Sequence, residues 1–282
     1  MMTQENFAHA AEALRKGDRD RYLSTLVLTG SARHAVTALY AFNADIAAVR
    51  ERVSDPAPGE IRLQWWSDTL EGEGHGDVRQ NPVADALLDT IGRYNIPVGT
   101  LLRLIGARRF DLYDDPMPDL ATFEGYAGET VSTLYQLAAM ILNDGGAIEA
   151  GDAAGHLGVA HAMIGHLRAF GHVSAQGRIM LPWSVFEANG VRESEIFSGV
   201  ESDGLSEALG QIVELAADHL DSADAAIAML PGALKPAFAS TAVLRRQLVL
   251  FNQRQSGLFT LPADDVDWRK ILRLSWWALR NR

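Results

Sequence analysis

Carboxylates and histidines are the side chains through which this sequence could best hold a metal ion, because its 282 residues include no cysteine. Two carboxylates four residues apart on one helix face can chelate Mg²⁺. The candidates are Asp111 with Asp115, and the run of Asp218, Asp221 and Asp224. Asp115 falls at an expected helix end and the run forms a polar stripe, so we favour a solvated role for both sets.

Four histidines lie close together in the sequence: His156, His161, His166 and His172. Ligands on one helix face need a spacing of three or four residues, whereas these are separated by five, five and six. Five residues turn a helix by roughly 140° beyond a full turn, so the side chains should point apart. We therefore interpret them as surface or partly buried histidines and predict no metal site.

The composition and the missing motifs argue against further kinds of chemistry. Without cysteine the chain has no disulfide, thiolate zinc site or cysteine nucleophile. There is no G-x-S-x-G motif, P-loop or dinucleotide-binding glycine pattern, which argues against hydrolase and nucleotide-binding functions. The 25 lysines and arginines are outnumbered by 36 acidic residues, and this net charge of -11 argues against a nucleic-acid partner.

The location of the protein is predicted from features that its sequence lacks. The N-terminal segment has no apolar region typical of a secretory signal and carries acidic residues, unlike a transit peptide. No segment approaches the roughly 18 uncharged apolar residues that a membrane span requires. The expected protein is therefore soluble and cytoplasmic.

The C-terminal segment, residues 266–282, mixes tryptophans with basic side chains. These are Trp268, Trp276, Trp277, Arg269, Lys270, Arg273, Arg280 and Arg282. Such a segment suits peripheral contact with an anionic membrane surface, or a groove of a partner protein. The alternative, which we favour, is a terminal helix that docks on the core and keeps its arginines in water.

Apolar residues recur at spacings of three and four along nearly the whole chain, and alternating β-branched runs are missing, which predicts an all-α protein. The helices are expected at residues 31–52, 60–70, 82–94, 98–114, 120–142, 151–170, 205–230, 234–255 and 266–280, with short pieces over 171–204. No linker, repeat or composition shift divides the chain, so we expect a single domain over residues 1–282.

Two of these helices carry more specific expectations. Ser31 is the expected N-cap of the first one. Its apolar stripe comprises Ala35, Leu39, Phe42, Ile46 and Val49. The segment 159–170 is apolar on more than one face, so its helix should lie inside the bundle.

The segment RDRYLSTLVLTGSARHAVTALYAFNADIAAVRE resembles the squalene/phytoene synthase family. Three later pieces are similar in the same order: Asp111 followed by Tyr126 in GYAGETVSTLY, then HLGVAHAMIGHLRAFGHVSAQGRIMLP, then LPGALKPAF. The resemblance covers nearly the whole chain. It implies an isoprenoid synthase-like fold, a single α-helical bundle that encloses a deep apolar central cavity.

The sequence departs from this family at the acids that bind Mg²⁺ and the substrate diphosphates. Ala47 and Ala48 stand where the family's D-D-x-x-D motif has its aspartate pair, and Glu51 keeps its carboxylate. In the second motif, Ala169 and Val173 stand where the family has aspartates. Ionising an allylic diphosphate requires metal ions that neutralise the leaving group. The resemblance therefore implies a synthase-like protein with no catalytic residue, no metal and no cofactor.

Five other positions match the family and are candidates for lining the cavity. They are Arg33, Tyr40, Tyr126, Arg168 and Arg178. By resemblance they would meet an anionic head group there. Structural roles, in which they join helices and loops through hydrogen bonds, are an equally weighted alternative.

The departures themselves resemble a non-catalytic branch of the family that assists the assembly of respiratory complex I. The shared features are the A-F-N after Tyr40, the group Arg62, Gln64, Trp65 and Trp66, and the L-R-A at Leu167 to Ala169. The implied partner is a complex I subunit or assembly protein, and the implied cavity ligand is an isoprenoid or another lipid. The implied location is the cytoplasm, peripheral at the inner membrane.

The alternative is an enzyme that joins farnesyl or geranylgeranyl diphosphates with relocated acids. Asp111 and Asp115 are then the expected carboxylates, and Mg²⁺ the expected cofactor. Two carboxylates facing each other across the central cavity, within reach of one metal ion, would favour this alternative.

Overall fold

The chain folds into a bundle of helices in a computed structural model that describes residues 4–253 and 257–281. These residues form helices, turns and loops and no strand, which confirms the all-α prediction. One hydrophobic cluster extends from Ala10 near the N-terminus to Phe251 in the penultimate helix. The elements that position the candidate site therefore share a core.

Two helices precede the first one that the sequence predicted. They are α1 (Gln4–Gly17) and α2 (Arg19–Ser24). α1 packs against α3 (Gly30–Ala47) and α5 (Pro82–Tyr94), and it buries Ala10 and Leu14. Asp18 caps α2, since its carboxylate accepts a hydrogen bond from the backbone N–H of Arg21 at 3.0 Å.

The prediction for the next helix was wrong at both ends. α3 has Thr29 at its N-cap and ends at Ala47, where a separate 3₁₀ turn, Arg50–Arg52, follows after two residues. Ser31 lies inside the helix and is not its N-cap. All five residues of the predicted stripe are buried, and so are most residues between them, because other helices cover α3 on several sides.

The middle helices match their predicted positions more closely. α4 (Pro56–Glu71) and α5 begin at prolines, and the side chain of Asn81 accepts hydrogen bonds from the first backbone N–H groups of α5. α6 (Val98–Arg108) ends earlier than predicted, because the chain tightens there into the 3₁₀ turn Arg109–Leu112.

The predicted helix over 120–142 is interrupted. α7 (Leu120–Ala127) continues into a π-helical turn, Gly128–Ser132, and then into α8 (Thr133–Leu142). α9 (Gly151–Ser174) lies against this turn at Gly158. A Cβ atom at Gly158 would come within 2.5 Å of the backbone N and Cα of Ser132, so only glycine allows this approach.

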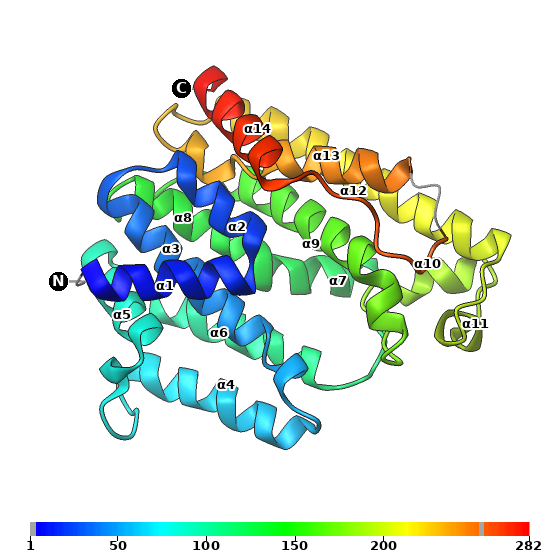
Figure 1. The fold of residues 1–282 in the computed structure, drawn as a ribbon, viewed down its shortest axis with the longest axis horizontal. Helices are drawn as coiled ribbons and strands as arrows, with labels where there is room; N and C mark the ends of the chain where they lie inside the picture. Colours follow the sequence, from blue (N-terminus) through cyan, green and yellow to red (C-terminus); the bar gives the residue numbers. More distant parts are fainter. Residues whose placement is uncertain (1–3, 254–256, 282) are drawn as a thin grey trace.

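α9 runs through the middle of the bundle, where it packs against α8, α12 (Asp203–Met229) and α13 (Thr241–Asn252) (Figure 1). Most residues between Val159 and Phe170 are buried, which confirms that this helix lies inside. The predicted short pieces over 171–204 include α10 (Trp183–Ala188) and α11 (Glu193–Phe197).

The last two predicted helices are also present with altered bounds. α13 starts later than residue 234, because the 3₁₀ turn Lys235–Phe238 precedes it, and the predicted end at 255 lies outside the described residues. α14 (Asp267–Arg280) lies along the outer edge of the molecule beside α13 (Figure 1). Within residues 4–253 and 257–281, no helix has the length and apolarity needed to cross a membrane.

The close approach of α9 to the π-helical turn generates a stability prediction. Gly158→Ala forces a Cβ against backbone atoms of Ser132, so it should lower the free energy of unfolding by about 1–3 kcal/mol in urea denaturation. Gly165→Ala, in the same helix, meets nothing within 4 Å. This control should be neutral or raise stability by up to about 1 kcal/mol, because alanine favours helix more than glycine does. Equal effects of the two substitutions would contradict the packing described here.

Candidate functional site

A cavity of about 440 Å³ opens between the end of α3, the end of α6, the π-helical turn and α9. Four of the five positions at which the sequence predicted a degenerate metal site line it together: Ala47 at the end of α3, Glu51 in the 3₁₀ turn that follows, and Ala169 and Val173 in α9. Ala48, the fifth, is not among the lining residues. The fold thus brings two segments more than a hundred residues apart to one cavity, with one carboxylate and three small apolar side chains.

Charged side chains form much of the remaining wall. They are four arginines, Arg21, Arg50, Arg108 and Arg178, and three carboxylates, Asp18, Glu51 and Asp111. The sequence predicted an apolar cavity, and apolar residues such as Val131 and Met180 do line part of it. The arginines make the rest suitable for an anion, because guanidinium groups bind phosphate and carboxylate oxygens with paired hydrogen bonds.

A triangle of hydrogen bonds joins three of these lining residues. Arg108 donates to Asp111 at 3.1 Å and to the hydroxyl of Tyr126 at 2.7 Å, and that hydroxyl donates to the other carboxylate oxygen at 2.7 Å. Burial raises the pKa of Tyr126 above its ordinary value, and the neighbouring carboxylate adds to this effect. Tyr126 therefore stays protonated and keeps Asp111 fixed against Arg108.

Arg178 differs from the other three arginines of the cavity, because its hydrogen-bond partners among the described residues are all neutral. Its guanidinium donates to the side-chain oxygen of Gln176 at 2.6 Å and to the backbone oxygen of Asp111 at 3.5 Å. Arg178 is only 8% exposed. The Nε atoms of Arg50, Arg108 and Arg178 are buried and have no hydrogen-bond partner in the described part of the chain.

Two of the four clustered histidines, His161 and His166, line the same cavity, although their spacing predicted side chains that point apart. Their contacts nevertheless differ. Nδ1 of His161 lies 2.7 Å from the hydroxyl of Tyr135, and the ring of His166 packs edge-on against Phe123. Burial lowers the pKa of His161 to about 3 and that of His166 to about 4. Both rings are therefore neutral near pH 7 and add no positive charge.

The other two histidines lie outside the cavity. Nδ1 of His156 is 3.0 Å from Nδ1 of His219, and Nε2 of His172 is 3.0 Å from the side-chain nitrogen of Gln176. Within the described ranges, no group of three or more histidines, aspartates or glutamates could hold a metal ion.

Of the five matched positions, the structure brings Tyr126 and Arg178 to the cavity. Arg33, Tyr40 and Arg168 are not among its lining residues. Arg33 lies near the start of α3, and its backbone oxygen accepts the hydroxyl of Thr37. Their proposed contact with a head group gains no support from this placement.

Tyr40 and Arg168 have other contacts that explain their positions. The Tyr40 ring lies 5.7 Å from the Arg21 guanidinium, and burial raises the pKa of its hydroxyl above the ordinary value. Arg168 forms ion pairs with Asp264 at 2.5 Å and with Asp20 at 3.7 Å. These partners hold Arg168 against α2 and against the segment that precedes α14.

The relocated acids of the alternative enzyme hypothesis do not meet in the cavity. Asp111 lines it, with both carboxylate oxygens engaged in the triangle, while Asp115 is exposed and is not a lining residue. In the second acidic set, Asp221 and Asp224 both pair with Arg245, at 2.8 Å and 2.5 Å.

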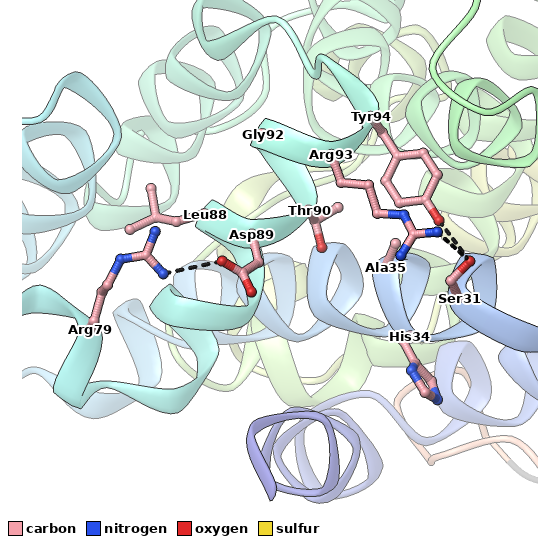
Figure 2. Close-up of a pocket in the computed structure, with 10 residues that line it drawn as sticks. All are labelled: Ser31, His34, Ala35, Arg79, Leu88, Asp89, Thr90, Gly92, Arg93 and Tyr94. Atoms are coloured by element: carbon pink, nitrogen blue, oxygen red, sulfur yellow. Dashed lines mark hydrogen bonds and ion pairs between the residues drawn. The ribbon is translucent and has the colours of Figure 1, made fainter. Parts of the chain in front are cut away.

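A second hollow, of about 500 Å³, lies between the start of α3 and α5. Figure 2 shows Arg93 and Tyr94 converging on Ser31, whose hydroxyl accepts a hydrogen bond from each, at 3.1 and 3.2 Å. Ser31 was predicted to cap α3, and its hydroxyl instead forms these tertiary hydrogen bonds to α5. Near the other end, Arg79 pairs with Asp89 at 3.2 Å (Figure 2). None of the predicted site residues lines this hollow.

Sequence reasoning missed several residues of the cavity, chiefly Arg21, Arg50 and Arg108. Arg108 carried one usable signal, since it precedes Asp111 by three residues and such a pair meets on one helix face. Arg21 and Arg50 come from separate elements, and no spacing in the sequence links them to this cavity.

Comparison with known proteins gives a consistent family. A family model described as squalene/phytoene synthase matches residues 14–270. The human protein named NADH dehydrogenase (ubiquinone) complex I, assembly factor 6, is 29% identical to this chain over 93% of it and 82% of the human protein. The 15-cis-phytoene synthase of Synechococcus elongatus is 26% identical over 90% of this chain and 86% of its own length.

Solved structures agree on the fold. A dehydrosqualene synthase crystallised with a ligand has a TM-score of 0.81 to this chain, at 18% identity, covering 98% of this chain and 96% of that one. This likeness confirms the predicted isoprenoid synthase-like helical fold.

The buried neutral histidines generate a prediction on pH. The pKa of His166 is about 4 in the folded protein and near 6.5 when unfolded, so below pH 6.5 the unfolded chain takes up a proton that the folded chain does not. Stability should therefore fall as the pH drops from 7 to 5, by about 2 kcal/mol from this residue. In urea denaturation, the free energy of unfolding of His166→Phe should fall between pH 7 and pH 5 by about 2 kcal/mol less than that of the wild type. For Gly165→Ala it should fall by the same amount as for the wild type. Parallel curves for His166→Phe and the wild type would contradict the assignment.

Proposed function

The chain belongs to the squalene/phytoene synthase family, and on that premise we propose that it is a non-enzymatic member. Its cavity binds the anionic head group of an isoprenoid or another lipid without metal ions and without turnover. The protein uses this bound form to assist the assembly of respiratory complex I.

The observation that carries the binding proposal is the state of Arg178. A guanidinium that is nearly buried and bonded only to neutral oxygens is costly, because desolvation of its charge is not offset by a counter-charge. A phosphate or carboxylate in the cavity supplies that counter-charge.

The lack of turnover is proposed from the residues where a synthase would hold its metal ions. Ala47, Ala169 and Val173 present methyl groups to the cavity, and Glu51 is exposed at its edge. Arginines can bind a diphosphate, but loss of diphosphate from an allylic carbon builds negative charge that metal ions normally neutralise. Binding without ionisation is the outcome that this set of side chains favours.

The role in complex I assembly is proposed from similarity to the human assembly factor, which extends over 93% of this chain. Its partner would be a complex I subunit or another assembly protein, met at the surface of the inner membrane. The bound lipid would then act as a structural ligand of the protein.

The binding proposal is tested by titration calorimetry with farnesyl diphosphate in the presence of EDTA. We expect binding without metal and no gain in affinity when Mg²⁺ replaces EDTA. Arg178→Gln removes the charge-assisted hydrogen bonds and should weaken binding by about 10- to 100-fold. Arg192→Gln, an exposed arginine paired with Glu195 outside the cavity, is the matched control and should bind as the wild type.

Three results would contradict this proposal. One is release of diphosphate with turnover in Mg²⁺, which would restore the prenyl transferase alternative. Another is binding that strictly requires a metal ion. The third is equal affinity of Arg178→Gln and the wild type, which would move the ligand away from this cavity.

The assembly role is tested separately by deleting the gene in its own host and measuring complex I on native gels. We expect the amount of assembled complex I to fall and to return when the wild-type chain is expressed again. Arg178→Gln should restore less of it than Arg192→Gln does, at equal protein levels. Unchanged complex I after deletion would refute the assembly role without affecting the binding result.

A further inference from the structure

One face of α14 exposes four large apolar side chains in a row. Trp268, Leu272, Trp276 and Leu279 are 58%, 60%, 63% and 63% exposed. Their spacing of four, four and three residues places them along a single line on the helix, which we call the outer stripe. Large apolar side chains gathered in water in this way typically mark a binding surface.

The opposite face of α14 is docked on the protein and fixes the direction of the outer stripe. Leu274 and Ala278 are buried there, and so is Lys270, which pairs with Asp20 and Asp264 at 2.7 and 2.6 Å. At about 100° per residue, the centre of this face lies roughly 160° from that of the outer stripe. The predicted docking on the core is therefore present, and it leaves an apolar face turned outward.

A row of arginines runs beside the outer stripe. Arg269, Arg273 and Arg280 are exposed and fall within about 40° of one another on the helix. The carboxylate of Asp265 forms ion pairs with Arg269 at 4.0 Å and with Arg273 at 3.0 Å. It also pairs with Arg246, at 3.5 Å. One carboxylate shared by three cations leaves this edge positively charged.

Two of the arginines also stack on the tryptophans of the outer stripe. The guanidinium of Arg269 lies 5.2 Å from the ring of Trp268, and that of Arg280 lies 5.9 Å from the ring of Trp276. Each pair places a cation at the edge of an apolar surface. Tryptophan favours the boundary between lipid headgroups and acyl chains, where arginine meets lipid phosphates.

We propose that the outer stripe docks α14 in the plane of an anionic lipid bilayer. The tryptophan and leucine side chains enter the boundary of the acyl region, and the arginine row contacts the lipid phosphates. Charge favours this occupant and this orientation. The chain has a net charge of -11, so an anionic surface repels the protein as a whole and attracts it through this basic edge.

The test is co-sedimentation of the full chain with vesicles. We expect binding to vesicles of phosphatidylcholine and phosphatidylglycerol in a 7:3 ratio, and much weaker binding to phosphatidylcholine alone, with a loss of binding as salt is raised. The double variant Trp268→Ser and Trp276→Ser should bind about tenfold less or weaker still. Truncation at residue 266 is unsuitable, because it would uncover the buried contacts of Leu274.

Matched controls distinguish vesicle binding through the outer stripe from nonspecific binding by other exposed apolar side chains and from ligand binding in the cavity. Ile61→Ser with Met229→Ser removes two other exposed apolar side chains, 71% and 86% exposed, that lie on α4 and α12. This control should bind vesicles as the wild type does. Arg192→Gln, which removes an exposed arginine outside α14 and outside the cavity, should too. Farnesyl diphosphate titration reports on the cavity and vesicle binding reports on the outer stripe, so either proposal can fail without the other.

Three outcomes would overturn the proposal. The first is equal vesicle binding by the double tryptophan variant and the wild type. The second is equal binding of the wild type to neutral and anionic vesicles. The third is no vesicle binding together with self-association that the double variant abolishes, which would assign the outer stripe to a second copy of the chain.

Discussion

Several arginines around one cavity impose the electrostatic constraint on which the rest of the site depends. Like charges near each other in a partly buried space raise the free energy of the folded chain unless counter-charges offset them. The chain supplies such counter-charges for Arg21, Arg50 and Arg108, in the form of Asp18, Asp114 and Asp111. For Arg178 it supplies neutral oxygens only. Three of the cavity's arginines are therefore each paired with a carboxylate, and Arg178 is not. An anion in the cavity would lower the electrostatic free energy most beside Arg178.

The position of α9 determines how these groups meet. Gly158 lets this helix lie directly against the π-helical turn, and the same turn contributes Thr130 and Val131 to the cavity. π-helical turns place side chains at positions that a regular α-helix would not, and they are frequent at functional sites. One helix turn further along, α9 brings His161, and beyond it Ala169, to the same wall. Packing at a glycine thus sets the geometry of the cavity wall.

The long helices could be predicted from the sequence because apolar periodicity and proline or asparagine punctuation encode them locally. Ser31 shows where this fails, since a residue type suited to an N-cap was used for a tertiary contact with Tyr94. The small side chains of the cavity were located through family resemblance, which carries three-dimensional information that periodicity does not. Arg21 and Arg50 were not foreseen, because their convergence depends on how separate elements pack. No local pattern reports that packing.

A partly buried ionic cluster joins α9, which lines the cavity, to the C-terminal helix. Asp20 of α2 and Asp264 each pair with Arg168 of α9 and with Lys270 of α14. These partners raise the pKa of Lys270 although burial opposes it, so the lysine stays charged and the cluster stays neutral overall. Two cations and two anions that share partners stabilise one another, and removing either anion leaves the buried Lys270 with one counter-charge fewer. Arg168, one of the positions that match the family, thus links α9, which lines the cavity, to the helix that carries the outer stripe.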